Sequence, residues 1–533
     1  MDLLKRNKLY ITLFLTAFFY YYWFSAGWFF QGEFWAETGS NYWLATRQLS
    51  FINQLALPDY GYGVYLLRIL SFLISKITPS SLNIANVFNF ISILIVIGSC
   101  LSIFYYLENK MHRWEAILLT TSLFLIFDFE SRTFINAPYS LVIPLILFIV
   151  TTIDGRKPKL FEVIIFPLVI FSKPLIFPLA IPYLIALLFS RHKRFFSISL
   201  LIIIGSFEII NILNQQGLGG AKNHFSIENI ILGVVFFIGK FIIGENIKFN
   251  STVILMALSL LFILVMVTIF IIKKHRFELI FSIVIIYAIT SNIMMNVLAL
   301  PGWDNPSAIL KGLPLNRHII ISNISMLMFV MICLVTLRKS ISLRPVSVVV
   351  AFLLWFVGSG WYVSAISTSQ YEPKIVASSN WSLFINDRRS VNLSMDCIPI
   401  DPLGWAVGSC RSTGKNNWTS ELFYSPQIIG LGSNHLFEIP NDLLNGSNLC
   451  ALGLMVSTVG GANAYFEAAI KSGNKEVVGR MVGVARTGAG QVVLRPTSYG
   501  CINNAKLIEI RSSAPYSPMV DRLLEFNPIF YVN

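Results

Sequence analysis

The chain is poor in charged residues. Of its 533 residues only 13% are Asp, Glu, Lys or Arg, whereas 55% are hydrophobic. Charged residues make up about a quarter of an ordinary soluble protein, so this composition argues against a soluble chain and predicts many membrane-spanning helices. Acids are the scarcer sign, with 27 Asp and Glu against 40 Lys and Arg, and the net charge is +13. Basic residues collect in the cytoplasmic loops of membrane proteins, which accounts for the excess.

Motifs that would indicate several other functions are missing. The sequence has no Walker loop, no Gly-x-Gly-x-x-Gly after a strand and no zinc-protease motif. No basic stripe is interleaved with stacking aromatics, so we do not expect a nucleic acid as partner. The turns predicted on the cytoplasmic side are a few residues long, which is too short for a nucleotide-binding domain. We therefore expect any chemistry on the outer face, where a donor has to arrive in lipid-linked form.

Cysteine is also scarce, with six residues in the chain. Cys100 and Cys333 fall in apolar runs and are expected to behave as small apolar residues. The other four lie in the C-terminal region, and they are Cys397, Cys410, Cys450 and Cys501. An even number in a polar domain predicts disulfides and an oxidising compartment, whereas the absence of Cys-x-x-Cys spacing argues against zinc. Three pairings are open, and we favour Cys397–Cys410 with Cys450–Cys501.

Long apolar runs dominate the first two thirds of the chain. A membrane-spanning helix needs about 20 apolar residues, or fewer when it is kinked. The eleven predicted spans are 9–30, 83–107, 115–128, 138–153, 160–172, 174–190, 196–213, 251–272, 279–299, 319–336 and 346–364. No small-residue cleavage site follows the first run, so we expect it to stay in the protein as a helix.

The charges of the turns predict the direction of the spans. With the N-terminus inside, every second turn should be basic. All five such turns are basic, and their charged residues are Lys110, His112 and Arg113; Arg156, Lys157 and Lys159; Arg191, Lys193 and Arg194; Lys273, Lys274 and Arg276; and Arg338, Lys339 and Arg344. The pattern therefore predicts a cytoplasmic N-terminus and an outer C-terminal region.

The outer segments are longer than the inner turns. Residues 31–82 form the first outer loop and contain an apolar stretch, 62–76, that we expect to lie as a helix in the membrane interface. A later outer loop, 214–250, contains a second such stretch, 227–243. Beyond residue 364 the chain is polar and shows short alternating runs, at 476–484, 491–494 and 506–510. We expect a membrane domain over 1–364 and a mainly β domain, a sandwich or jelly roll, over 365–533.

Acidic and basic residues cluster at the predicted outer ends of the spans. Glu33 and Glu37 follow the first span, and a spacing of four puts them on one face if the segment is helical. Asp128, Glu130 and Arg132 follow the third span, and Lys173 lies between the short proline-rich pair. The loop before the tenth span holds Trp303, Asp304, Lys311, Arg317 and His318. A carboxylate there can act as a general base, and a cation can offset the charge of a leaving phosphate.

This arrangement resembles the GT-C class of membrane glycosyltransferases, and within it most closely the serotype-converting O-antigen glucosyltransferases of enteric bacteria and their phages. The resemblance rests on Glu33-Phe-Trp-Ala-Glu37-Thr-Gly in the first outer loop, Phe171-Ser-Lys-Pro174 at the short pair, and the cysteine-bearing outer tail. It spans the whole chain as an arrangement, although its local motifs are short. Many GT-C members carry an Asp-containing pair at the first-loop site, whereas this chain has Glu-x-x-x-Glu, so the corresponding acid stays open between Glu33 and Glu37.

The resemblance implies an inverting transfer of a hexose, with glucose the expected sugar, from undecaprenyl phosphate to an O-antigen glycan at the periplasmic face of a bacterial inner membrane. It favours Glu37, with Glu33 as the alternative, as the base. Lys173, Arg132 and Arg317 become candidates for the donor phosphate, and the C-terminal domain a candidate for the acceptor, with Trp381, Trp405 and Trp418 available for stacking. No cofactor is required, although Asp128 and Glu130 offer ligands for a divalent metal. A donor synthase and a flippase would have to supply the lipid-linked sugar.

Two other functions stay open. An O-antigen polymerase or ligase would also use lipid-linked glycans, but such enzymes typically carry a large outer loop between late spans and lack an outer C-terminal domain of this size. A non-enzymatic transporter should show internal repeats and ionisable groups at mid-membrane. The charges of this chain instead gather at the ends of its spans.

Overall fold

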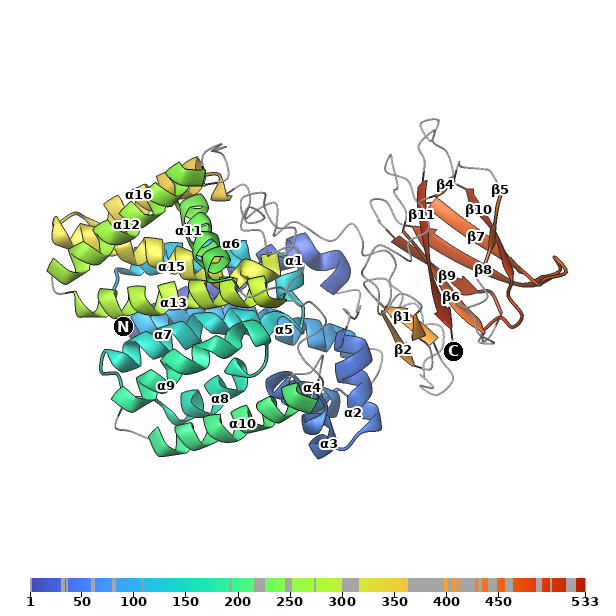
Figure 1. Ribbon diagram of the computed structural model, residues 1–533, viewed down its shortest axis with the longest axis horizontal. Coiled ribbons are helices and arrows are strands. Elements are labelled where there is room, and N and C mark those ends of the chain that lie inside the picture. Colours follow the sequence, from blue (N-terminus) through green and yellow to red (C-terminus); the bar gives the residue numbers. More distant parts are fainter. Residues whose placement is uncertain are drawn as a thin grey trace. The chain divides into compact units, whose positions relative to one another are not determined.

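A computed structural model describes most of the helical region and the strands of the C-terminal region (Figure 1). The described residues are 2–29, 34, 37–58, 63–78, 83–107, 109–190, 194–214, 226–244, 252–272, 275–299, 316–362, 397–400, 405–408, 411–412, 427–429, 434–439, 448–455, 464–485, 491–498, 501–513 and 524–532. The predicted domain boundary at 364/365 lies outside them.

The chain divides into two compact units. The first comprises Met1–Trp23, Ile52–Ile69 and Ile91–Gln370, and the second comprises Phe24–Phe51, Leu70–Phe90 and Tyr371–Asn533. The first and last parts of the predicted first outer loop, with the adjoining ends of α1 and α5, therefore belong to the same unit as the C-terminal strands.

The described part of the region up to residue 362 is almost entirely helical. Its helices are α1 (Asp2–Phe29), the π-helix η1 (Thr38–Trp43), α2 (Leu44–Gln48), α3 (Phe51–Ala56), α4 (Tyr65–Ile77), α5 (Ile84–Leu107), α6 (Arg113–Ile126), the 3₁₀-helices η2 (Glu130–Arg132) and η3 (Ala137–Leu141), α7 (Val142–Ile153), α8 (Leu160–Ile170), the 3₁₀-helix η4 (Pro174–Leu179), α9 (Ala180–Phe189), α10 (Arg194–Asn214), α11 (Ile227–Ile243), α12 (Thr252–Ile272), α13 (Arg276–Ala299), α15 (Asn316–Ser340) and α16 (Pro345–Gly358). Each of the eleven predicted spans overlaps one helix or a 3₁₀-helix joined to an α-helix, although α16 ends at Gly358, before the predicted end of the last span at 364.

Proline sets the breaks within this region. Pro174 begins η4, where its fixed φ fits a first helical turn and its missing N–H costs no hydrogen bond. Pro178 lies inside η4, and the chain becomes α-helical only from Ala180 onward. The predicted short pair is therefore α8 followed by η4 and α9. The two stretches expected to lie in the interface, 62–76 and 227–243, are also helices, α4 and α11.

Three of the described helical segments are long and apolar enough to cross a membrane. They are Ile84–Leu107, Arg276–Leu298 and His318–Ser340. The other apolar helical segments over the described side chains are shorter, at 10–17 residues. This finding supports membrane association.

Ion pairs join the helix ends that carry the predicted cytoplasmic turns. Arg338 Nε of α15 lies 2.7 Å from Oε1 of the fully buried Glu115 in α6. Glu115 Oε2 also accepts from the backbone N–H of His112 at 2.6 Å, which satisfies a donor at the start of α6. Lys110 pairs with Asp154 at 2.8 Å and Lys339 with Glu278 at 3.6 Å. A buried carboxylate requires such partners, so these turns are held to one another.

A second buried carboxylate, Glu162, organises the start of α8. It accepts from the Arg156 guanidinium at 2.6 Å, from the Tyr106 hydroxyl at 2.7 Å and from the backbone N–H of Lys159 at 2.7 Å. Burial of the Arg156 guanidinium works against its charge, but the hydrogen bond and the negative charge of Glu162 outweigh this effect and raise the pKa of Arg156.

The C-terminal region is a β structure. Its described strands are β1 (Cys397–Ile400), β2 (Trp405–Gly408), β3 (Arg411–Ser412), β4 (Gln427–Ile429), β5 (Asn434–Glu438), β6 (Leu449–Met455), β7 (Ala464–Lys471), β8 (Val477–Ala485), β9 (Gln491–Pro496), β10 (Leu507–Ser513) and β11 (Leu524–Val532). β1 and β2 form a two-stranded antiparallel sheet. The others form an antiparallel sheet in the order β3-β11-β6-β9-β8-β7-β10-β5, with β4 paired to β11.

One hydrophobic core lies against this larger sheet. Among the described residues, β8 pairs with β9 through Met481 with Pro496 and Val482 with Arg495. Leu452 and Leu454 from β6 and Phe466 from β7 belong to the same buried cluster. Side chains of alternating residues from neighbouring strands thus share one buried interior.

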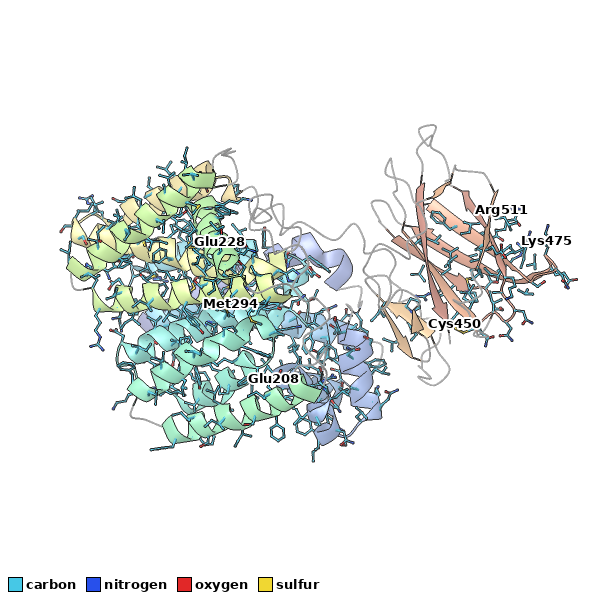
Figure 2. The ribbon with its side chains drawn as sticks, viewed as in Figure 1. Glu208, Glu228, Met294, Cys450, Lys475 and Arg511 are labelled. Atoms are coloured by element: carbon cyan, nitrogen blue, oxygen red, sulfur yellow. A yellow bond between two sulfur atoms is a disulfide. The ribbon has the colours of Figure 1, made fainter. Side chains whose placement is uncertain are left out.

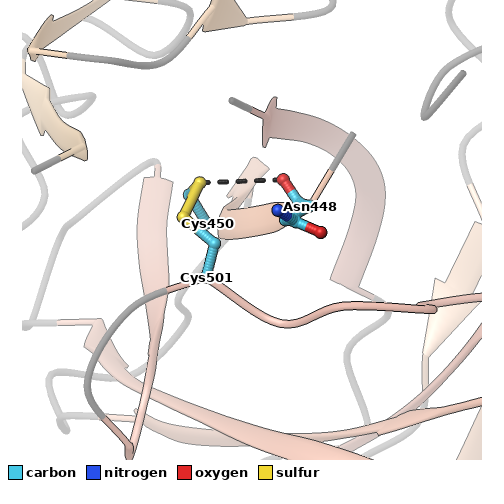
Figure 3. Close-up of a disulfide and its surroundings, with 3 residues drawn as sticks. All are labelled: Asn448, Cys450 and Cys501. Atoms are coloured by element: carbon cyan, nitrogen blue, oxygen red, sulfur yellow. Dashed lines mark hydrogen bonds between the residues drawn. A yellow bond between two sulfur atoms is a disulfide. The ribbon is translucent and has the colours of Figure 1, made fainter. Parts of the chain in front are cut away.

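A disulfide links the start of β6 to the turn before β10. It joins Cys450 to Cys501, the pairing favoured from the sequence, and both lie beside Asn448 in Figure 3. The backbones also meet there, because Leu449 and Ile502 exchange two N–H to O hydrogen bonds, of 2.9 and 2.8 Å. The disulfide therefore reinforces a contact that the sheet already makes. Of the second favoured pair, Cys410 lies outside the described residues, as does the side chain of Cys397.

Candidate functional site

The three charged residues that follow the third predicted span form one tight turn. Asp128 Oδ1 accepts a 2.8 Å hydrogen bond from the backbone N–H of Ser131, which is the local bond by which Asp starts turns. The chain then forms η2, and the carbonyl of Glu130 accepts from Thr133 Oγ1 at 2.7 Å and from Asn136 Nδ2 at 3.0 Å. These bonds fix the backbone that carries Asp128, Glu130 and Arg132.

Arg132 is completely buried in the first unit. Its guanidinium carbon lies 4.6 Å from the ring centroid of Tyr21 in α1, a cation–π distance. The Tyr21 hydroxyl in turn donates to the carbonyl of Phe124 in α6 at 2.9 Å. The cation is therefore held against Tyr21 of α1, which is itself fixed to α6. A guanidinium in such a setting is suited to bind a phosphate or carboxylate, because little water competes.

Lys173 occupies the junction between α8 and η4. It is a nearly buried residue with extended backbone, and its carbonyl accepts from the N–H of Ile176 at 2.9 Å. The preceding residue, Ser172, donates its hydroxyl to the carbonyl of Leu168. η4 packs against α13, where the Tyr287 hydroxyl donates to the carbonyl of Pro178 at 2.8 Å. Lys173 thus lies at a corner that hydrogen bonds within α8 and η4 and packing against α13 hold in place.

His318 lies in the first turn of α15. Its carbonyl accepts from Asn292 Nδ2 at 3.1 Å and from Asn296 Nδ2 at 2.7 Å, both on α13. The Ser322 hydroxyl donates to Asn292 Oδ1 at 2.7 Å, so the two helices share a buried polar network. α15 also packs against η2 and η3, which brings the helix of His318 to the turn of Asp128, Glu130 and Arg132. Arg317 is in the same helix, but its side chain lies outside the described residues.

Glu37 belongs to the second unit and directly precedes the π-helix η1. Its side chain is half-buried, whereas the first residues of η1, Thr38 and Gly39, are fully buried. π-helices are rare and occur frequently at functional sites. η1 packs against β2, so part of the C-terminal region contacts the segment that starts at Glu37.

Aromatic side chains hold this segment in place. The ring of Phe34 lies 5.7 Å from that of Trp43 at the end of η1 and 5.8 Å from that of Phe88 in α5. The Arg47 guanidinium lies 5.7 Å from the Trp43 ring centroid. These contacts give Glu37 a fixed backbone, which a general base requires.

Several predicted site residues are outside the described part of the chain. Glu33, Trp303, Asp304, Lys311, Trp381 and Trp418 lie outside it, together with the side chain of Trp405. Their predicted roles stay predictions.

Sequence reasoning missed one candidate residue, Glu208 in α10. Its side chain is buried, and its two carboxylate oxygens accept from the backbone N–H of Gly63 at 2.9 and 2.7 Å. A signal was present, because Glu208 is the one acid in the predicted span 196–213. An ionisable residue within such a span is a functional candidate by default. The expectation that charges gather only at span ends therefore overlooked it.

Among the described residues, no three His, Cys, Asp or Glu side chains are grouped closely enough to hold a metal ion. Comparison of the chain with protein-family models, curated proteins and solved structures found no match to any of them.

Proposed function

We propose that the chain is an inverting glycosyltransferase that moves a hexose, with glucose the expected sugar, from undecaprenyl phosphate to an O-antigen glycan on the periplasmic face of the membrane. The observation that carries the proposal is the setting of Glu37. It is a half-buried acid at the start of a buried π-helix, on a backbone held by aromatic contacts. Such a carboxylate is suited to take a proton from a sugar hydroxyl.

The proposal includes a topology of eleven spans, with the N-terminus in the cytoplasm and the C-terminal region in the periplasm of a bacterial inner membrane. Support comes from the five basic turns and from the helices that overlap every predicted span. The disulfide between Cys450 and Cys501 supports an oxidising compartment for the C-terminal region. The two arguments rest on different residues.

The proposed reaction is a single displacement. Glu37, or Glu33, removes the proton of the acceptor hydroxyl, and the hydroxyl oxygen attacks the anomeric carbon. The bond between that carbon and the phosphate oxygen breaks, and undecaprenyl phosphate leaves with the electron pair. Arg132, Lys173 and Arg317 are the candidates to offset its charge, and a buried cation such as Arg132 has the largest effect because the surroundings are apolar.

Glu208 favours a second candidate function, a transporter of polyprenyl-linked glycans, because transporters carry ionisable groups within their spans. Two observations make the transporter less favoured than the glycosyltransferase. Both carboxylate oxygens of Glu208 already accept from the Gly63 amide, and ion pairs such as Arg338–Glu115 hold the predicted cytoplasmic turns together. Flipping of a fluorescent lipid-linked sugar in proteoliposomes, without glycan modification, would favour the transporter.

The test of the glycosyltransferase is transfer of a labelled hexose from its polyprenyl phosphate to lipopolysaccharide in membranes that contain the protein. Glu37→Gln keeps the size of the side chain and removes the base, so we expect transfer to fall by about a hundredfold or more. Glu33→Gln decides between the two acids. Glu228→Gln is the matched control, since Glu228 is an exposed acid in the first turn of α11. Wild-type transfer in both Glu37→Gln and Glu33→Gln would exclude the proposed base.

A further inference from the structure

Glu208 lies on the buried face of an otherwise apolar helix. Leu201 and Ile204, seven and four residues earlier, are buried on the same face of α10, whereas Phe207 and Ile209 are exposed. Figure 2 labels Glu208 on α10, and it also labels Glu228, an exposed acid on α11. The carboxylate therefore points into the first unit, away from the lipid that would surround the outward-facing side chains.

The partner of Glu208 is the backbone just before α4. The N–H of Gly63 donates to both carboxylate oxygens, at 2.9 and 2.7 Å, across 145 positions of sequence. Val64, the next residue, accepts the first helical hydrogen bond of α4 from Arg68 N–H at 2.9 Å. The carboxylate thus lies at the N-terminus of a 13-residue helix, where the helix dipole and the charge-assisted hydrogen bond both favour a negative group.

Glycine at position 63 makes this contact possible. A Cβ there would lie 2.6 Å from Glu208 Oε2 and 2.5 Å from ring carbons of Tyr65. Both distances are far below van der Waals contact, and the Tyr65 ring belongs to the first turn of α4. Any larger residue would therefore separate the Gly63 amide from the carboxylate.

The position of Glu208 along α10 tells how deep the contact lies. Asn214, its last residue, is six residues further on, and at 1.5 Å per residue this is about 9 Å. In the proposed topology α10 ends at the outer face, so the first outer loop reaches about two helical turns below that end. Non-helical backbone at such depth is tolerated only where protein or a water-filled cavity surrounds it, and its amides need partners. Glu208 is the hydrogen-bond partner of the Gly63 amide.

We infer that Glu208 is a positioning residue that fixes the start of α4, and through it the depth of the first outer loop in the membrane. Its consequence for catalysis rests on the proposed function. α4 exposes Leu73 and Ile77 next to Lys76, as a helix in the membrane interface does. A polyprenyl-linked donor is anchored in the same layer by its lipid, so the depth of α4 sets how the donor meets the first outer loop.

Hydrogen exchange of the full-length protein in lipid nanodiscs tests the positioning directly. Glu208→Leu removes the acceptor while its apolar side chain suits the buried face, and we expect the amides of residues 63–67 to exchange about tenfold faster or more. Glu208→Gln keeps one acceptor oxygen without the charge, so its effect should be intermediate. Gly63→Ala should act like Glu208→Leu, whereas Gly98→Ala, in α5 with open space around it, should leave exchange unchanged.

Steady-state kinetics test the catalytic consequence in the same variants. For Glu208→Leu we expect the KM for the lipid-linked donor to rise about tenfold while kcat changes less. In Glu208→Gln the KM should rise by a smaller factor, and in the control Glu228→Gln both KM and kcat should stay at their wild-type values. The inference is overturned if the amides of residues 63–67 exchange no faster in Glu208→Leu, Glu208→Gln and Gly63→Ala than in the control Glu228→Gln. If wild-type protein transfers no sugar but the exchange results hold, the proposed function fails and the positioning role stands. If Glu208→Leu does not fold, the other two variants decide.

Discussion

The side chain of Ile400 in β1 packs directly over the backbone of Gly39 in the π-helix η1. A Cβ on Gly39 would lie 2.8 Å from Ile400 Cδ1 and 3.1 Å from Phe34 Cβ, so the site has no space for a methyl group. Ile400 is itself almost completely buried. This contact joins the two-stranded sheet at the start of the C-terminal region to the segment that begins with Glu37.

On the proposed function, the contact predicts that Gly39→Ala lowers sugar transfer without removing any charged group. The added methyl group must displace Ile400 or Phe34, and overpacking of this kind costs about 1–3 kcal/mol. Ile400→Ala should create space, so the double variant should recover part of the transfer that Gly39→Ala loses. Transfer rates of the two single variants and the double variant, at matched protein levels, measure this coupling. Additive losses in the double variant would contradict it.

The Arg338–Glu115 ion pair predicts a large effect on stability. Arg338→Met leaves the fully buried Glu115 carboxylate without its cation, and we expect the thermal unfolding temperature in detergent to fall in line with a loss of about 3–5 kcal/mol. Arg338→Met with Glu115→Gln removes both charges and should be more stable than Arg338→Met alone. Arg344→Met is the matched control, because Arg344 is exposed. Equal unfolding temperatures for Arg338→Met and Arg344→Met would show that the pair contributes little.

The disulfide predicts a redox-dependent stability of the C-terminal strands. Cys450 and Cys501 are 51 positions apart, and a loop of that size gives about 4 kcal/mol in the chain-entropy account. Cys450→Ser with Cys501→Ser should therefore raise hydrogen exchange in β6 and β10. A reductant should do the same to wild type, whereas exchange in β6 and β10 of the double variant should not rise further. Cys333→Ser serves as control, since Cys333 is a buried free thiol in α15. Unchanged exchange after verified reduction would refute the prediction.

Glu509 predicts a stability change at acid pH. Its carboxylate lies 2.6 Å from Lys471 Nζ across strands β10 and β7, and this hydrogen bond and charge hold the pKa of Glu509 below its ordinary value of 4.5. Because the folded-state pKa is the lower one, the stabilisation is complete above pH 4.5 and is lost as the pH falls through the folded-state pKa. The effect should be small, because the pair lies near the surface.

Hydrogen exchange of β7 and β10 between pH 6 and 3 measures this effect. Glu509→Gln should remove part of the acid sensitivity, whereas Glu438→Gln on the neighbouring strand β5 is the matched control. Identical acid profiles for Glu509→Gln and wild type would argue against a role of the Lys471 pair.

Local patterns in the sequence were sufficient for most helices. A long apolar run is helical in a membrane because every backbone N–H and C=O must be satisfied within the segment, and this requirement does not depend on neighbours. The predicted stretch 227–243 is α11 at the same bounds, and Pro174 marks the start of η4 as its fixed φ requires. The alternating run 476–484 became β8 for a similarly local reason, the two-residue period of a half-buried strand.

Contacts between segments that are distant in the chain could not be predicted from local sequence patterns. The sequence contains Glu208, Gly63, Gly39 and Ile400, but no periodicity relates residues 145 positions apart or tells which backbone amide a carboxylate will meet. Even the π-helix at Thr38–Trp43 has no sequence signature. Its wider turns make weaker hydrogen bonds than an α-helix, and packing against Phe34 and β2 compensates for this loss.

The sequence by itself determined that this protein is a mostly helical chain, with helices long and apolar enough to cross a membrane and a β-structured C-terminal region, because hydrophobic runs, proline positions and alternation act locally. Tertiary structure alone decided which acids became fixed in place: Glu115 by Arg338, Glu208 by the Gly63 amide, and the Glu37 segment by its contacts with Phe34 and β2. The physical reason is that burying a carboxylate is favourable only where the fold supplies donors or cations, and for Glu115 and Glu208 the Arg338 guanidinium and the Gly63 amide come from segments far away in the chain.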